Sequence, residues 1–539
     1  MNKIFKLFSI GLIALSAVSC DSWLDDVKQT SKVDDVSVFE SERTVDLYVD
    51  GFYTWLNGYG AFGDKQFSGS LTEAMTDIFK YAGSNQTARA GQPNDYSMLA
   101  VPMTVDGGGL YGCWTHAYNC IRRINQFLVL LDEHGAKYPE NRIAEWQAQA
   151  RFFRSFFYFR LARRHGGVIL YDALPVHDKA RSTEEETWDF IQADFDFAAA
   201  NLPDAWNAAN KGRVTRFAAL AMQSRAMLYA QRWQAAFDAA DAVVQSGKYQ
   251  LTPKFTDAYK GGNSESILEY RYSATTGPNH NFDANYVPST DKSAASCGAC
   301  PTQEFVECFE TADGHKVDWS AWHSNTTTRP PYETLEPRFA ATVMYPGCTW
   351  KGMTMDFSVQ GPNVVYFDYG TRAGGGGETV TGYALRKLID ENHTDITAVK
   401  SAQTWVEIRY AEVLLNKAEA AYRLNRISDA QQAMNQVRAR VGLPGKDTTG
   451  DQWFKDYRNE RKIELAFEGH LFWDMNRWRL CHIEYNNYRR HGLKIDNGMY
   501  QYVECDNADQ MFDQKCYILP IPSDELKNNK LIEQYDNWK

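Results

Sequence analysis

The chain has 539 residues, a formal net charge of −11, and hydrophobic and charged fractions of 44% and 23%. These fractions are ordinary for a globular protein that is long enough to bury a large core. With no basic stripe to override the negative charge, DNA and RNA are excluded as expected partners, because a polyanion is repelled.

The first twenty residues predict export and lipidation. Lys3 and Lys6 precede an apolar run over residues 8–18, which is typical of a secretory signal and too short for an ordinary membrane-spanning helix. The run leads into Ala17-Val18-Ser19-Cys20, which looks like a bacterial lipobox. We therefore expect residues 1–19 to be a lipoprotein signal peptide and Cys20 to be acylated as the new N-terminus. A secreted protein with an incidental Cys20 is the alternative.

The spacing of apolar residues predicts helices through much of the first half of the chain. Steps of three and four residues favour helices over residues 41–53, 112–131, 142–164, 215–230 and 233–246. Gly166 and Gly167 form a stop signal after the third of these helices. Thr183 and Glu186 have the spacing of a capping box, which predicts a further helix that ends at Leu202.

A second helical set is predicted over residues 407–424, 427–441 and 452–479. Helix pairs of about 34 residues with small residues at their contacts suggest tetratricopeptide-like hairpins. The small residues that suit such contacts are Ala218, Ala219, Ala221, Ala235, Ala236, Ala239 and Ala240. Trp114, Trp146 and Trp233 lie on apolar helix faces, and we expect them in the core.

Residues 58–110 and 250–400 differ from the helical sets, because they are rich in Gly, Pro, Thr, Asn, Tyr and Trp and have few helical periods. We therefore predict a mostly α fold, in which a helical-hairpin scaffold carries long loops and short β-hairpins. Long loops on a rigid scaffold are where binding residues usually lie. The glycines of residues 374–377 lack the Lys-Ser or Lys-Thr of a phosphate-binding loop, and no cofactor is expected.

Cysteines and histidines give no convincing metal site. Cys297, Cys300 and Cys308, with His315 beyond them, have the wrong spacing for a common zinc finger. Export favours disulfides over thiol ligands. A Cys297–Cys300 or Cys297–Cys308 disulfide, or free thiols, is therefore favoured over a metal ion.

Several segments carry a resemblance to a known family. An Arg-aromatic helix runs from Gln149 to Leu161, and Gly-Arg-Val-Thr-Arg over residues 212–216 precedes an Ala-rich helix. The most specific stretch is Glu460-Arg-Lys-Ile-Glu-Leu-Ala-Phe-Glu-Gly-His470, and Leu519-Pro-Ile-Pro522 follows near the end. Together they resemble the SusD/RagB family of outer-membrane nutrient-binding lipoproteins, over nearly the whole mature chain.

The resemblance implies a lipoprotein on the surface of the outer membrane. It would capture a glycan and deliver it, without chemistry, to a SusC-like TonB-dependent transporter. It also implies an N-terminal region with helical repeats (20–250) and a C-terminal region (251–539), together one compact unit. The C-terminal region would divide into a loop-rich insert (251–400) and a helical motif (401–539). Two alternatives stay open: the same scaffold capturing a peptide or another nutrient, and an enzyme or a helical-repeat adaptor.

In the family, the ligand surface is built from loops before the first long helix and from the middle insert. The matching regions hold the residues that we predict to contact the glycan: Asp77, Tyr81, Asn85, Arg89, Tyr286, Trp319, Trp322 and Trp350. A sugar packs its CH face on an aromatic ring while polar side chains bind its hydroxyls. Trp319 and Trp322 are the best placed, beside Asp318, although each ring could equally be buried.

The acidic residues Glu460, Glu464 and Glu468 are four apart, on one face of a predicted helix. We expect Arg461 and Arg477 to pair with some of them and to tie helices together. No motif selects the two opposed carboxylates of a glycosidase, and the His-Glu-x-x-His of a zinc hydrolase is absent from the sequence. The chain is therefore not expected to be an enzyme.

Overall fold

A computed structural model gives the structure of the chain. It describes residues 35–58, 72–81, 113–174, 178–288, 298–362, 366–368, 379–396, 398–506 and 509–539. Within these segments, no helix combines the length and the apolar character that crossing a membrane requires.

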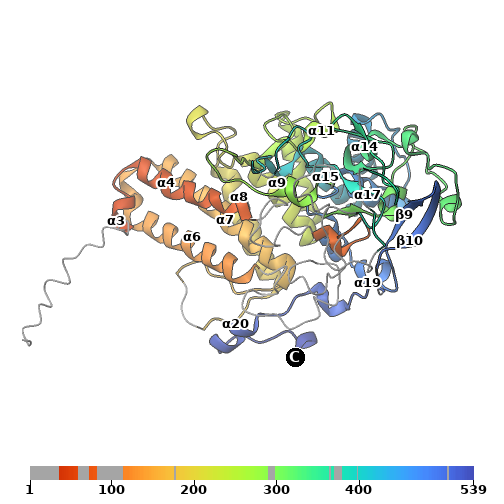
Figure 1. The fold of residues 1–539 in the computed structure, drawn as a ribbon. Helices are drawn as coiled ribbons and strands as arrows, with labels where there is room; N and C mark the ends of the chain where they lie inside the picture. Colours follow the sequence, from red (N-terminus) through yellow and green to blue (C-terminus); the bar gives the residue numbers. More distant parts are fainter. Residues whose placement is uncertain are drawn as a thin grey trace, which may run out of the picture.

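Long helices pack one against the next to form a scaffold (Figure 1). They are α4 (Glu42–Tyr53), α6 (Trp114–His134), α7 (Glu140–His165), α8 (Glu184–Asn201), α9 (Arg216–Tyr229), α10 (Trp233–Gln245), α15 (Tyr410–Arg423) and α16 (Ile427–Arg440). Contacts run in order from α6 to α10 and then pass directly to α15 and α16. The two helical sets that the sequence predicts are thus one continuous scaffold, which confirms the mostly α fold.

Local sequence signals set where several of these helices begin and end. Thr183 and Glu186 form the predicted capping box of α8, in which the Glu186 N–H donates to Thr183 Oγ1 at 3.1 Å. Ser41 and Thr44 form another capping box at α4. Gly166 ends α7 with a φ of +62°. Each signal joins residues that are close in sequence, so it acts before any tertiary contact forms.

The first hydrophobic core lies between these helices. Small side chains allow close helix contact, and the fully buried alanines of α9 and α10 are Ala218, Ala219, Ala221, Ala226, Ala236 and Ala240. Trp114 and Trp146 are buried in this core as expected. Trp233 is only partly buried and packs at the edge of the core.

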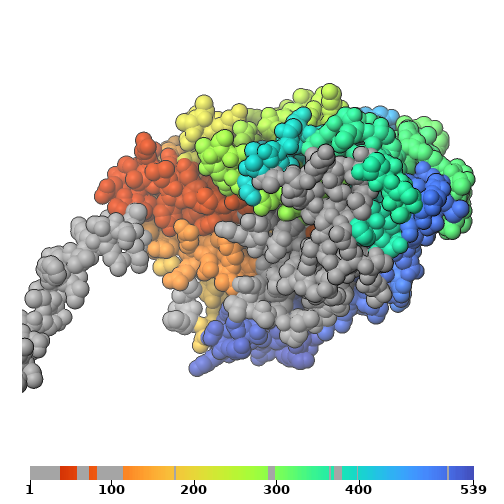
Figure 2. Space-filling model, viewed as in Figure 1, coloured from red at the N-terminus to blue at the C-terminus, as the bar shows by residue number. Residues whose placement is uncertain are grey.

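A second core lies under the loop-rich segments and the C-terminal residues. The helices around it are α11 (Phe255–Ala258), α12 (Phe282–Tyr286), α13 (Gln303–Glu307), α14 (Pro337–Thr342), α17 (Gly450–Glu464), α18 (Leu471–Arg477) and α19 (Cys481–Glu484). Helix α20 (Ser523–Asn528) follows near the C-terminus, and α3 (Asp35–Val38) precedes α4. In Figure 1, α14, α17, α19 and the β9–β10 pair lie at the opposite end of the molecule from α4 and α6, whereas α20 lies below α6. The space-filling view of Figure 2 shows α4 in red at its end of the molecule.

The strands are short and pair antiparallel in twos. The pairs are β1 (Phe79–Lys80) with β3 (Cys300–Pro301), β2 (Ser266–Tyr270) with β8 (Trp405–Arg409), β4 (Val343–Met344) with β7 (Ala384–Leu385), β5 (Thr349–Trp350) with β6 (Met353–Thr354), and β9 (His491–Asp496) with β10 (Met499–Glu504). The pair β5–β6 is a short hairpin of the kind expected in the loop-rich insert, whereas the hairpin β9–β10 lies in residues 401–539, for which a helical motif was expected.

Two predicted helix boundaries are wrong. The helix expected from residue 407 begins at Tyr410, because residues up to Arg409 form strand β8 against β2. The helix expected over 452–479 divides into α17 and α18. Phe467 and Gly469 lie between them with φ values of +63° and +82°, a left-handed backbone that ends a right-handed helix. The apolar spacing continued across the break because residues on both sides are buried.

The acidic motif is confirmed as an ion-pairing element, but its expected partners are wrong. Arg461 and Arg477 pair with Asp474, and Arg477 also pairs with Glu419. The three glutamates instead form a buried charge cluster whose ion pairs are Arg338–Glu460, Arg438–Glu460, Arg338–Glu464, Arg409–Glu464, Arg440–Glu464, Arg409–Glu468 and Lys387–Glu468. This cluster joins α17 to α14, β8 and α16.

Candidate ligand-binding surfaces

Four of the aromatic residues predicted to contact a glycan are buried. Tyr81, Tyr286, Trp319 and Trp350 have 2%, 1%, 4% and 0% of their surface exposed and lie in the second core. Aromatic rings make up much of this core. A sugar stacks on an exposed ring face, so these four rings form no open aromatic platform in this structure. Ligand contact by them stays a prediction that requires the rings to become uncovered.

Asp77 is held in contacts with other parts of the fold. Its Oδ2 pairs with Lys462 Nζ at 2.6 Å, and its Oδ1 accepts a hydrogen bond from the Tyr485 hydroxyl at 3.1 Å. These contacts tie the segment around β1 to α17 and to the residue that follows α19. Asn85, Arg89 and Cys20 lie outside the described residues, so their predicted roles stay predictions.

Trp322 differs from the other predicted aromatic residues that the structure describes, because part of its ring is exposed. It lies in η7 (Ser320–Trp322) and packs against Trp319, with ring centroids 5.4 Å apart. Its Nε1 donates a hydrogen bond to the Thr328 carbonyl at 2.9 Å. These two contacts orient the ring, and a fixed ring stacks on a ligand at a lower entropic cost.

A group of three contacting rings lies in the same part of the fold, where η7 contacts β10. Tyr502 stacks with His491, with ring centroids 4.2 Å apart, and lies at a tilt against His323, with ring centroids 4.6 Å apart. The imidazoles are held by carboxylates: His491 by Glu304 at 2.6 Å and His323 by Glu307 at 2.8 Å. The sequence interpretation missed this group. The Asn-Gly turn between β9 and β10 is a hairpin signal that could have placed Tyr502 on a strand.

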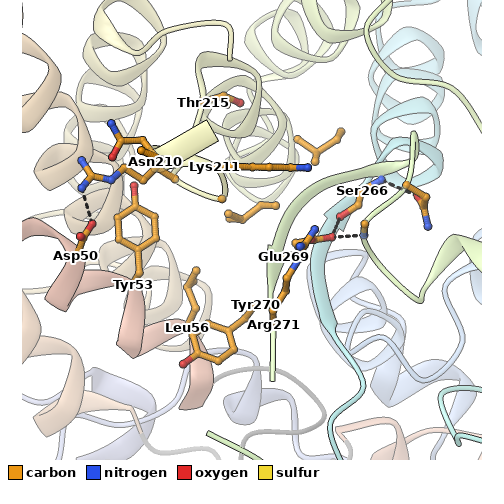
Figure 3. Close-up of a pocket in the computed structure, with 17 residues that line it drawn as sticks. Asp50, Tyr53, Leu56, Asn210, Lys211, Thr215, Ser266, Glu269, Tyr270 and Arg271 are labelled. Atoms are coloured by element: carbon orange, nitrogen blue, oxygen red, sulfur yellow. Dashed lines mark hydrogen bonds and ion pairs between the residues drawn. The ribbon is translucent and has the colours of Figure 1, made fainter. Parts of the chain in front are cut away.

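A cleft of about 710 Å³ opens between α4, the loop before α9 and strand β2, and we name it the β2 cleft (Figure 3). Its volume is in the range of sites for small ligands. Tyr53 fixes one wall, since its hydroxyl donates to Gln149 Oε1 at 2.7 Å and accepts from the Val214 N–H at 3.0 Å. The other wall is formed by β2 and the residues on either side of it.

Both carboxylates that line the β2 cleft are already bound by other groups. Asp50 Oδ1 pairs with Arg213 Nη2 at 2.8 Å, although burial raises the pKa of Asp50 more than the Arg213 charge lowers it. Glu269 accepts three hydrogen bonds, each at 2.6 Å, from Arg271 Nε, Ser266 Oγ and the Gly262 N–H. Burial raises the pKa of Glu269, but these bonds outweigh burial and leave the pKa lowered.

A second cleft of about 780 Å³ lies between α11, α14 and the residues that precede β8. Its Arg386 pairs with Glu391 at 3.0 Å, and the side chain of Arg386 is thereby neutralised. Gly261 separates the two clefts: a Cβ added there would lie 2.5 Å from Thr404 Cγ2 in this cleft and 2.7 Å from Glu269 Oε2 in the β2 cleft. The two clefts are therefore adjacent.

The described residues contain no candidate metal site. Among the described residues, no three His, Cys, Asp or Glu side chains gather in a group that could hold a metal ion. Cys297 lies outside the described residues, so the disulfide alternatives that involve it stay predictions.

The chain matches two family models. One, the SusD family, covers residues 264–538, and the other, "Starch-binding associating with outer membrane", covers residues 22–228. A curated relative, SusD-like protein P2 of Formosa agariphila, is 23% identical over 529 residues, covering 92% of each chain. SusD-like protein P25 of the same organism is 22% identical over 575 residues, covering 99% of this chain and 98% of the relative.

Solved structures have the same fold. A SusD-like protein from Bacteroides fragilis is 26% identical, with a TM-score of 0.79 over 94% of this chain and 98% of that one. A SusD-like carbohydrate-binding protein from the same species is 21% identical, with a TM-score of 0.76 over 92% and 100%. A laminarin-binding SusD-like protein is 20% identical, with a TM-score of 0.66 over 92% and 99%. Because the first family model alone spans slightly more than half of the sequence, this chain belongs to the SusD family.

Proposed function

We propose that this protein is a non-catalytic lipoprotein of the cell surface that binds an oligosaccharide or polysaccharide. It would be anchored in the outer membrane through acylated Cys20 and would deliver the glycan to a SusC-like TonB-dependent transporter. The observation that carries the proposal is the family match together with structural neighbours that are named for carbohydrate or laminarin binding.

The architecture supports capture of a ligand by loops on a rigid frame. One continuous helical scaffold holds the loop-rich segments; the β2 cleft opens where the scaffold meets them, and the second cleft lies beside it, mostly within the loop-rich insert. Trp322 supplies a partly exposed and oriented ring on a different loop. Sites of this kind bind by shape and hydrogen bonding and need no reacting group.

The acidic residues that first suggest catalysis support a structural role instead. Glu464 has no exposed surface, and the guanidinium groups of Arg409 and Arg338 lie 2.6 Å and 3.1 Å from its carboxylate. A glycosidase needs carboxylates that face each other across a cleft open to substrate. An assay for new reducing ends with the purified protein tests the proposal, because steady release of sugar would show catalysis.

Affinity electrophoresis against a panel of polysaccharides tests glycan binding. We expect the protein to be retained by at least one glycan and Trp322→Ala to weaken that retention about tenfold, as for the loss of one ring contact. Trp538→Ala is the matched control: Trp538 is also partly buried and donates Nε1 to a backbone carbonyl, that of Ile518 at 2.8 Å, but it lies near the C-terminus. Retention by none of the glycans would overturn the proposal, and binding of a peptide panel instead would favour peptide capture.

Membrane attachment is tested separately. Metabolic labelling with a radioactive fatty acid should label the wild-type protein and not Cys20→Ser. External protease should then degrade the wild-type protein on intact cells. A wild-type protein that takes up no label would contradict the lipid anchor without affecting glycan binding.

A further inference from the structure

Several side chains of the β2 cleft have hydrogen-bonding groups without a partner in the part of the chain that the structure describes. They are the Lys211 ammonium, the terminal N–H groups of Arg271, the Tyr270 hydroxyl and the side-chain amide of Asn210. Only Nε of the Arg271 guanidinium is engaged, by Glu269 at 2.6 Å. Asn210 and Tyr270 are neutral and Arg271 is paired with Glu269, so the unpaired charge left for a ligand is the positive charge of Lys211.

These side chains line different sides of the cleft. Figure 3 shows Lys211 extending from the loop before α9 across the cleft towards the β2 wall, while Tyr270 lies beside Leu56 on the lower side. The Arg271 side chain is 60% exposed at the end of that wall. A ligand in the cleft would thus meet the Lys211 ammonium from one wall and the terminal N–H donors of Arg271, whose charge is paired with Glu269, from the other.

The carboxylates of the cleft are already in use. Asp50 is paired with Arg213, and Glu269 is bound by three donors, so neither carboxylate is free to neutralise Lys211. Among the charged residues that line the cleft, Lys211 is therefore the one without an ion-pair partner in the described part of the chain. A ligand that fits must bring acceptor oxygens and negative charge, and charge-assisted hydrogen bonds would then hold it.

We propose that the β2 cleft binds an acidic sugar unit of the captured glycan, through a carboxylate or a sulfate ester. Lys211 and Arg271 bind the anionic group, and the Tyr270 hydroxyl binds a neighbouring sugar oxygen. The inference rests on the proposed function and narrows its ligand class from glycans in general to acidic glycans. The adjacent second cleft leaves room for further units of the same chain.

Affinity electrophoresis with three polysaccharides tests the inference: neutral laminarin, carboxylated polygalacturonate and sulfated carrageenan. We expect the wild-type protein to be retained by the carboxylated or the sulfated polymer, and the identity of that polymer distinguishes the two anions. Lys211→Gln and Arg271→Gln should each weaken this retention at least about tenfold, as for the loss of a charged hydrogen bond. Raising NaCl from 0.05 to 0.5 M should weaken it as well.

Lys248→Gln is the control, because Lys248 is also an exposed lysine but pairs with Asp204 at 3.0 Å outside the cleft. Its retention should equal that of the wild type, and circular dichroism should show all variants folded. Binding to laminarin alone, or acidic-glycan binding that Lys211→Gln and Arg271→Gln leave unchanged, would overturn the inference while the proposed function stands. Failure to bind any of the three polymers and any glycan of a wider panel would overturn both the inference and the proposed function.

Discussion

Replacing Glu464 by Gln tests whether the buried charge cluster holds α17 to the rest of the fold. The carboxylate lies 2.6 Å from Arg409 Nη1 and 3.1 Å from Arg338 Nη1, and it also pairs with Arg440. Burial alone would raise the pKa of Glu464, but these three guanidinium groups outweigh burial and hold the pKa well below its usual value. Gln keeps the shape of the side chain and removes the charge, so three buried cations lose a shared counter-ion.

Removal of one partner from a buried ion pair costs about 3–5 kcal/mol, because the remaining charge stays buried. We expect Glu464→Gln to lower the free energy of unfolding by that amount, measured by urea denaturation followed by circular dichroism. Glu333→Gln is the matched control, since Glu333 pairs with Arg329 at 2.6 Å on the surface and its side chain is 55% exposed. Glu333→Gln should lower the free energy of unfolding by less than about 1 kcal/mol. Equal losses in the two variants would refute the reasoning.

Acid should destabilise the protein through Glu419. Burial raises the pKa of Glu419, but Arg477, 2.6 Å away, together with Arg461 and Trp478, outweighs burial and lowers that pKa to about 2. A lowered pKa gives stability that is present above the ordinary value of 4.5 and is lost as the pH falls towards 2. In Glu419→Gln the free energy of unfolding should therefore depend less on pH over that range. An unchanged slope of the unfolding free energy against pH would contradict this. Gly261→Ala should lower the melting temperature more than Gly277→Ala. Both glycines have positive φ, +72° and +62°, and an Ala in that conformation costs about 1–2 kcal/mol at either position. Only at Gly261 does the new Cβ also lie 2.5 Å from Thr404, which adds a steric clash. Equal shifts of the melting temperature in the two variants would argue against that clash.

Features that depend on neighbours along the chain follow from the sequence. The capping box of Thr183 and Glu186 and the stop at Gly166 lie where they were predicted, because their hydrogen bonds and backbone angles involve residues a few positions apart. The family was also visible in sequence through the motif over residues 460–470, which contains the three glutamates of the buried cluster.

Tertiary structure alone decided which side chains meet and which face solvent. Glu464 binds Arg338, 126 positions away, and no local spacing encodes such a partner. Trp350 and Trp322 both lie in polar, loop-rich sequence, yet the first is fully buried and the second partly exposed. An aromatic ring gains free energy in a core as readily as on a sugar, so exposure follows from how the loops fold over it. Lys211 and Arg271 share a cleft only because α9 and β2 pack together.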